Sequence, residues 1–208
     1  MKKLIPTITF CVFVYCIITT FPVALAANTQ SSDSPIEARI TELTNTINAH
    51  PNEAVSYYLR GNLYKVKNQY DLAISDFGHA IELNPKYAAA FFNRGISYEK
   101  KQEIDLAMRD YNKAINLDSS YALAYIYRGT LYYRDHKDNL ALEDSDKAIE
   151  LEPTQRSGYL LKGLILERKL MYQEAIENYR KLIANIIPKD PETIATAKFK
   201  IRELGGTI

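Results

Sequence analysis

The chain has 208 residues, of which 25% are charged, and a formal net charge of +1 at pH 7. This balance argues against a nucleic-acid-binding protein, because such proteins are usually strongly basic, and no nucleic-acid partner is expected. Both cysteines, Cys11 and Cys16, lie near the N-terminus. The remainder of the chain must therefore be stabilised by apolar burial and not by disulfides.

The first 26 residues have the pattern of a secretory signal peptide. A short basic start, residues 1–3, precedes an uncharged apolar stretch that ends in Ala24-Leu25-Ala26, the small-x-small pattern of a cleavage site. Cleavage predicts a periplasmic or secreted protein. The alternative is an uncleaved anchor in the inner membrane formed by residues 4–26, since this stretch is long enough to span a bilayer.

Residues 27–35 are small and polar and predict a flexible leader. An N-terminal segment over 36–53 follows, with a helix expected over 36–49. Its apolar residues recur at helical spacing, and they are Ile36, Ile40, Leu43 and Ile47. The polar turn His50-Pro51-Asn52 ends this helix.

The middle of the chain repeats itself at a constant spacing. A glycine recurs every 34 residues and an alanine follows each one twelve residues later, in the pairs Gly61 and Ala73, Gly95 and Ala107, Gly129 and Ala141, Gly163 and Ala175. This period predicts four repeats of two helices each over 54–189, namely 54–87, 88–121, 122–155 and 156–189. The small residues would let the two helices of a repeat approach closely.

The last segment, 190–208, predicts a capping helix. Asp190 and Pro191 provide an N-cap acceptor and a proline in the first turn. One apolar stripe follows at Ile194, Ala197, Ile201 and Leu204, and Gly205-Gly206 would end the helix. Such an end is expected to cover the apolar face of the last repeat.

These repeats resemble the tetratricopeptide repeat, over about residues 36–205. The resemblance implies an all-α fold, a right-handed α-solenoid of stacked helix-turn-helix pairs with a C-terminal capping helix. One departure is a basic residue where the family usually has a large apolar one, at Arg60, Arg94, Arg128 and Lys162. We interpret these side chains as aliphatic stems that pack while their charged heads reach water. A functional basic row is the alternative.

The resemblance also implies a binding groove, because the first helices of tetratricopeptide repeats line a concave surface. The positions that usually face a ligand correspond to Val55, Tyr58, Asn62, Lys65, Phe92, Asn93, Ile96, Glu99, Leu123, Ile126, Thr130 and Tyr133. An apolar and aromatic floor with a polar margin would bind a peptide or helix of a partner protein. Packing against neighbouring first helices is the alternative for Tyr58, Phe92 and Ile126.

One subtype of the family holds a chain-terminal carboxylate in a clamp of three cations and two asparagines. Asn62 and Asn93 correspond to the asparagines, but the cationic positions hold Tyr58, Leu123 and Tyr127. The clamp is therefore expected to be absent, and an acidic tail peptide is expected to bind poorly.

The sequence gives no sign of catalysis. His50, His79 and His136 lack metal-ligand spacing, and no catalytic residue, metal or cofactor is expected. The favoured function is a non-enzymatic periplasmic scaffold or adaptor for other proteins, such as an envelope protein or enzyme, with membrane contact only through an uncleaved signal. The alternative is a self-assembling structural protein, a homodimer or larger homo-oligomer, that associates through Leu160, Leu164 and Leu166 of the last repeat.

Overall fold

The structure is a computed structural model that describes residues 35–186 and 190–207. Within these residues the chain forms ten α-helices and no strand, which confirms the all-α fold. The expected signal peptide over 1–26 and residues 27–34 of the expected leader lie outside the described residues. The helices are α1 (Pro35–Ala49), α2 (Ala54–Val66), α3 (Tyr70–Leu83), α4 (Ala88–Lys100), α5 (Ile104–Leu117), α6 (Ala122–Arg134), α7 (Asp138–Leu151), α8 (Arg156–Arg168), α9 (Tyr172–Asn185) and α10 (Pro191–Glu203).

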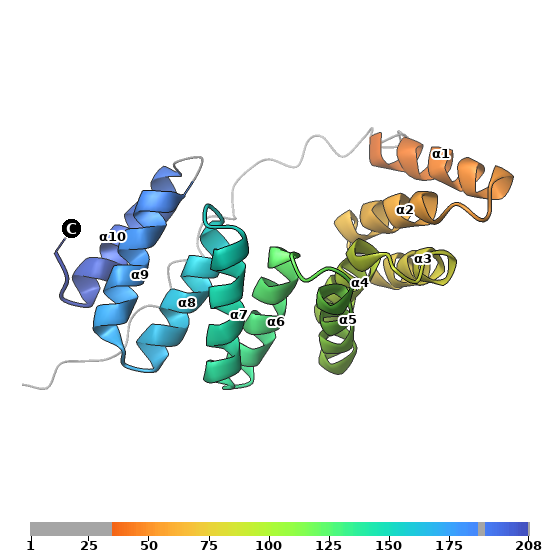
Figure 1. The fold of residues 1–208 in the computed structure, drawn as a ribbon. Coiled ribbons are helices and arrows are strands. Elements are labelled where there is room, and N and C mark those ends of the chain that lie inside the picture. The colour runs from red at the N-terminus through yellow and green to blue at the C-terminus, as the bar shows by residue number, and fades with distance from the viewer. Residues whose placement is uncertain (1–34, 187–189, 208) are drawn as a thin grey trace, which may run out of the picture.

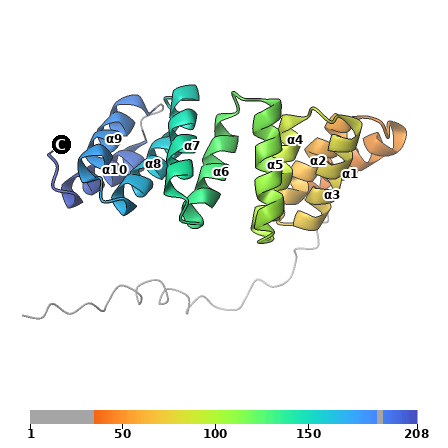
Figure 2. The ribbon, with the colours of Figure 1, turned by 60° about the horizontal axis from the view of Figure 1, so that its bottom comes forward.

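The helices follow one another along an arc with α1 at one end and α10 at the other (Figure 1). Turned by 60°, the arc is seen as a row of helices standing side by side (Figure 2). Each helix packs on the next in the chain, and the first helices of neighbouring repeats also touch, α2 with α4 and α6 with α8. These additional contacts place the first helices on the inner side of the arc, where neighbouring repeats lie closest.

Small residues hold the two helices of each repeat together. Ala73, Ala107, Ala141 and Ala175 are fully buried. A Cβ atom added to Gly95 would stand 2.7 Å from the Tyr111 ring, and one added to Gly61 would stand 2.9 Å from the Phe77 ring. These glycines are therefore needed for close approach, because a methyl group would occupy space that a buried ring already fills.

The turns inside the repeats share one backbone conformation without a glycine. Asn68, Gln102, His136 and Leu170, which occupy the same place in the four repeats, all have φ between 56° and 65°. In the first turn the Gln69 N–H donates to the Tyr64 carbonyl and the Asn68 N–H to the Lys65 carbonyl. This is the Schellman arrangement, which ends a helix by a residue in the left-handed region.

The two terminal helices differ from the repeats they extend. α1 starts at Pro35, the last residue of the expected leader, and precedes the equivalent part of α3 by one repeat length. Where α3 buries Ala73 and Asp76, α1 carries Arg39 and Glu42, which pair with each other in solvent. A polar outer face of this kind suits a helix at the end of the described row of helices.

At the other end, α10 covers the last repeat. The Asp190 side chain accepts a hydrogen bond from the Glu192 N–H, so the expected N-cap forms. Ala197 and Ile201 are fully buried against a cluster that contains Tyr179 and Leu182 of α9. Gly205 has a φ of 83° and follows the end of the helix.

Candidate functional site

A polar group joins α2 to α4 on the inner side of the arc. The Lys65 ammonium donates a hydrogen bond to Oδ1 of Asn93. The Asn93 amide nitrogen donates to the Tyr58 hydroxyl at 3.2 Å and to the Ala89 carbonyl at 2.9 Å. Asn93 is only 7% exposed, so its amide is fixed from several sides and holds Lys65 and Tyr58 in place.

The electrostatic position of Lys65 is unusual for a lysine. Its ammonium is partly buried, and burial lowers its pKa below the ordinary value. No carboxylate of the described residues pairs with it or offsets this shift. The site therefore presents a cation whose lost hydration is compensated by a neutral amide alone.

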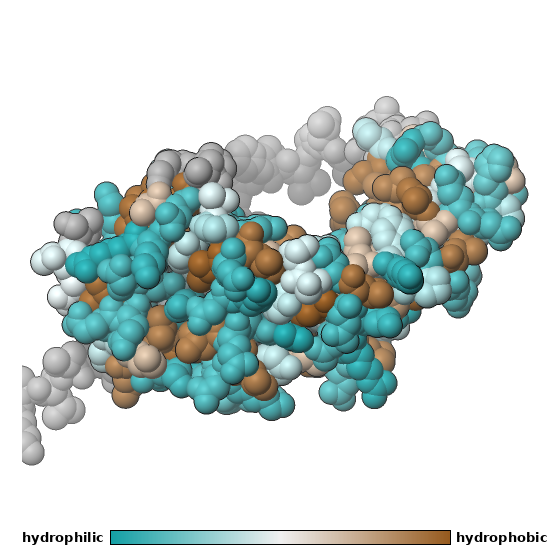
Figure 3. Space-filling view, viewed as in Figure 1, coloured by the Kyte–Doolittle hydropathy of each residue, from teal (hydrophilic) through white to brown (hydrophobic). Residues whose placement is uncertain are grey.

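Aromatic rings surround this polar group. The Tyr58 ring lies 4.8 Å from that of Tyr87. Further along the arc, the Phe92 ring contacts those of Tyr121 at 4.8 Å and Tyr127 at 5.1 Å. In Figure 3, hydrophobic side chains are visible over α2 and between α4 and α6, among polar ones.

Two predicted groove residues are packing residues. Phe92 is 4% exposed because the rings of Tyr111, Tyr121 and Tyr127 enclose it, and Ile126 is 6% exposed. The structure therefore places both in the packing alternative, not on an exposed groove floor. Their side chains support the inner surface from behind.

Sequence reasoning missed two tyrosines that pack on the rings of Tyr58 and Phe92. Tyr87 and Tyr121 stand directly before α4 and α6, and burial raises the pKa of Tyr121 to about 12. Both are half-buried, and they lie one repeat length apart. That spacing was the available signal, since it assigns both residues to the same place in successive repeats.

The remaining predicted residues are spread along the inner helices. Val55 is 49% exposed, and the Asn62 amide donates to the Tyr58 carbonyl of its own helix. Ile96 and Leu123 are half-buried beside the aromatic cluster. The Thr130 hydroxyl donates to the Ile126 carbonyl of its own helix.

Two of the predicted residues are engaged by arginines of the following repeat. Glu99 accepts hydrogen bonds from the Tyr111 hydroxyl at 2.9 Å and from Arg134 at 3.1 Å. The Arg168 guanidinium lies over the Tyr133 ring at 3.6 Å and donates to the Tyr133 carbonyl. The structure thus brings Tyr58, Lys65 and Asn93 into one group and leaves the other residues outside it.

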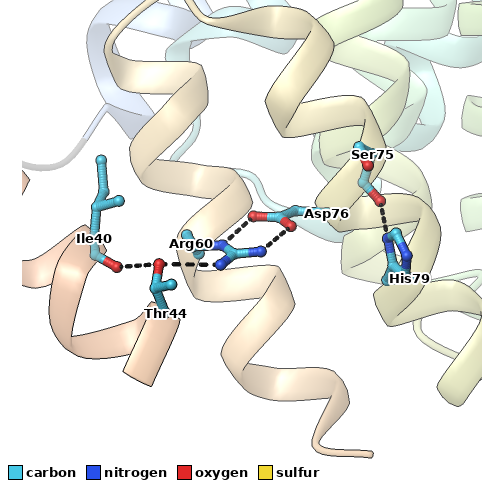
Figure 4. A network of polar contacts seen from close by, with 6 residues as sticks. All are labelled: Ile40, Thr44, Arg60, Ser75, Asp76 and His79. Carbon is cyan, nitrogen blue, oxygen red and sulfur yellow. Dashed lines mark hydrogen bonds and ion pairs between the residues drawn. The ribbon is translucent and has the colours of Figure 1, made fainter. Parts of the chain in front are cut away.

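The arginines that precede the repeat glycines have a structural role. Their guanidinium groups pair with aspartates and do not simply reach water. The Arg60 guanidinium donates two hydrogen bonds of 2.8 Å to Asp76 and a third to the Thr44 hydroxyl (Figure 4). Arg94 with Asp110 and Arg128 with Asp144 repeat the pairing. We call these three pairs the arginine–aspartate seam. The interpretation of water-exposed heads was wrong because it overlooked an aspartate sixteen residues after each arginine.

The fourth repeat departs from this seam. Lys162 replaces the arginine and pairs with the exposed Asp146 of α7. Asn178 replaces the aspartate, and its amide donates to the Tyr159 carbonyl. A neutral hydrogen bond therefore stands where the other repeats have a charged pair.

The histidines do not gather into a site. His79 stacks on the Tyr57 ring at 5.3 Å, while His50 and His136 are exposed at turns. Residues 35–186 and 190–207 contain no group of three histidine, cysteine or acidic side chains that could hold a metal ion. Over the same residues, none of the helices combines the length and apolar character needed to cross a membrane.

Two family models match overlapping parts of the chain. One, described as TPR repeat, covers residues 61–102, and the other, described as tetratricopeptide repeat, covers residues 88–121. Residues 61–121 are tetratricopeptide repeats. The resemblance drawn from the glycine and alanine spacing is thereby confirmed.

Solved structures of tetratricopeptide repeat proteins share the fold. MamA is 24% identical, with 72% of this chain and 88% of that chain covered and a TM-score of 0.66. YrrB, a TPR protein with an unusual peptide-binding site, is 21% identical, with 77% and 82% covered and a TM-score of 0.62. The first TPR of Spaghetti (RPAP3), bound to the HSP90 peptide SRMEEVD, is 26% identical, with 56% and 93% covered and a TM-score of 0.54. A comparison with curated proteins finds no match.

Proposed function

We propose that this protein is a non-enzymatic scaffold that binds a segment of another protein on the inner face of its arc. The observation that carries the proposal is the group of Tyr58, Lys65 and Asn93, which presents partly exposed polar atoms beside aromatic rings. Tyrosine is one of the few residue types that provide most of the energy of protein interfaces. The peptide-binding sites of YrrB and RPAP3 support the same use of the fold.

We further propose that the protein acts in the periplasm or outside the cell, as an adaptor for an envelope protein or enzyme. The support is the basic start, the apolar stretch and the small-x-small site in residues 1–26. An uncleaved segment over 4–26 would instead hold the same scaffold at the inner membrane. Fractionation of cells, with mass determination of the mature N-terminus, separates the two.

Crosslinking in cells tests the binding face. A photoreactive amino acid at Asn62, on α2 of the inner face, is expected to capture a discrete partner that the same group at Lys113, exposed on α5, does not capture. Equal capture from both positions would contradict the proposal. Self-crosslinks from Asn62 alone would favour a homo-oligomer that closes the inner face.

Part of the leucine surface that was expected to mediate self-assembly is buried inside the protein. Leu166 is 2% exposed within the cluster formed with α9 and α10, and Leu160 is half-buried beside it. Leu164 alone of the three is largely exposed, at 43%. A single leucine provides little area for a stable dimer, so we keep the scaffold as the proposed function.

A further inference from the structure

We infer that Lys65, Asn93 and Tyr58 form a subsite for the side-chain carboxylate of an aspartate or glutamate in the bound segment. This inference rests on the proposed function, because it assigns a ligand chemistry to one point of the proposed binding face. We call the three residues the Lys65 subsite.

The first argument is that four other cations near the inner helices already have a carboxylate. Arg134 pairs with Glu99, Arg168 with Asp138, and Lys200 with Glu167. Lys67, two residues beyond Lys65, pairs with Glu37 of α1. Lys65 differs from all four, since its hydrogen-bonded partner among the described residues is the Asn93 amide.

The second argument is the geometry of the donors. The Lys65 ammonium carries three N–H groups and uses one on Asn93. The Tyr58 hydroxyl accepts from Asn93, which leaves its own proton free to be donated. Because Asn93 is itself anchored to the Ala89 carbonyl, it holds both donors ready for one anionic group.

The third argument concerns the free energy of the unoccupied site. A partly buried ammonium with only a neutral partner loses hydration without gaining a counter-charge, which its lowered pKa reflects. A bound carboxylate would compensate for the lost hydration of the ammonium by supplying a counter-charge. The binding face therefore discriminates in favour of acidic ligands, since a neutral or basic side chain at this point leaves the cost in place.

A side-chain carboxylate fits better than a chain terminus. The three cationic positions of the carboxylate clamp hold Tyr58, Leu123 and Tyr127, so a terminal carboxylate would meet one cation in place of three. The neighbouring ring of Tyr87 also suits an apolar residue next to the acid in a continuing segment. The expectation that an acidic tail peptide binds poorly concerns the three clamp positions, and Lys65 is not one of them.

The test selects binding peptides from a library of random twelve-residue peptides with blocked termini. The target of the selection is the full chain. Three proteins are compared, namely the parent, Lys65→Gln and Lys67→Gln. The last removes the same charge at the same end of α2, but from a lysine that has its own acid. Thermal unfolding of all three checks that each is folded.

We expect aspartate or glutamate at one fixed position, next to an apolar residue, in peptides selected by the parent and by Lys67→Gln. Lys65→Gln is expected to bind those peptides about tenfold more weakly, the effect of losing one charge-assisted hydrogen bond. Replacing the acid by its amide in one selected peptide should weaken binding to the parent by a similar factor and have little effect on Lys65→Gln.

Each other result contradicts a specific statement. Peptides selected without an acidic preference, and bound equally by Lys65→Gln, would overturn the Lys65 subsite and leave the proposed function standing. A selected peptide whose acid can be replaced by its amide without weaker binding to the parent would also overturn it. If none of the proteins selects any peptide, the proposed function fails together with the inference.

Discussion

Lys65 should lower the stability of the free protein in which it sits. Its ammonium is partly desolvated and no carboxylate compensates for the loss. Replacing it with methionine keeps the length of the stem and removes the charge. We expect Lys65→Met to raise the free energy of unfolding by a few tenths to about 1 kcal/mol, a small effect because solvent screens the partly exposed group.

The pH dependence of that gain follows from the direction of the pKa shift. The folded state lowers the pKa of Lys65, so between the folded pKa and the ordinary value of 10.5 the unfolded chain binds more protons. Stability of the parent then rises with pH across this window, and the advantage of Lys65→Met shrinks. Urea unfolding at pH 7 and pH 10 measures both effects. A loss of stability in Lys65→Met at pH 7 would show that the ammonium is stabilising.

Alanine is expected to have opposite effects on stability at two helical glycines, because their surroundings differ. Gly95→Ala places a Cβ atom 2.7 Å from the buried Tyr111 ring, and we expect a loss of about 1–3 kcal/mol from overpacking. The matched control is Gly78→Ala in α3, where nothing lies within 4 Å and a gain of up to about 1 kcal/mol is expected from helix propensity. Denaturant unfolding of the two variants should give opposite signs. Equal effects would contradict the close approach of α4 and α5.

At the scale of the helices, the arginine–aspartate seam joins the first helix to the second helix in each of the first three repeats. Asp110 is 5% exposed and receives two hydrogen bonds from Arg94. Asp110→Asn leaves the guanidinium half-buried without its counter-charge, and we expect a loss of about 2–4 kcal/mol. Asp146→Asn breaks the exposed pair with Lys162 and is expected to cost less than about 1 kcal/mol. Thermal unfolding compares the two, and similar losses would show that the seam adds nothing to surface pairing.

The turns between the helices offer a gain in stability. Leu170 holds a φ of 60° and is 69% exposed, so its side chain contributes little packing while its backbone is strained. We expect Leu170→Gly to stabilise the protein by about 1 kcal/mol, because glycine adopts the left-handed region without a steric penalty. A calorimetric melting temperature below that of the parent would mean that the leucine side chain makes a contact worth more than this strain.

The repeat itself was predictable from the sequence, because small residues at a fixed spacing indicate pairs of helices that pack closely in the same way each time. Gly61 and Ala73 fix how closely two helices approach, and the period carries that arrangement along the chain. The seam was not predicted, because the head of Arg60 was expected to reach water, and the fold instead brings Asp76 beside it. Burial of Phe92 was weighed only as the alternative, because the covering rings of Tyr121, at the end of its own repeat, and Tyr127, in the following repeat, reach it through the fold.

For the whole molecule, the last repeat should depend on α10. Ala197 and Ile201 cover a cluster that includes Ile176, Tyr179 and Leu182 of α9. A chain ended at residue 186 would expose this cluster, and we expect α8 and α9 to lose hydrogen-exchange protection while α2 to α5 keep theirs. Phe199→Ser serves as control, because Phe199 is 63% exposed on α10 and its removal should change protection little. Uniform loss of protection along the arc would show that the repeats unfold as one unit.

The seam also gives the molecule a mechanical direction. Arg60 and Arg128 each join three helices, because they also reach Thr44 of α1 and Asn112 of α5. Beyond the third repeat this fastening gives way to Lys162 and Asn178, whose bonds are exposed or uncharged. A chain pulled from both ends should therefore unravel from the C-terminal quarter inward. The three repeats that carry the seam, with the Lys65 subsite among them, would stay folded and able to hold a ligand under tension.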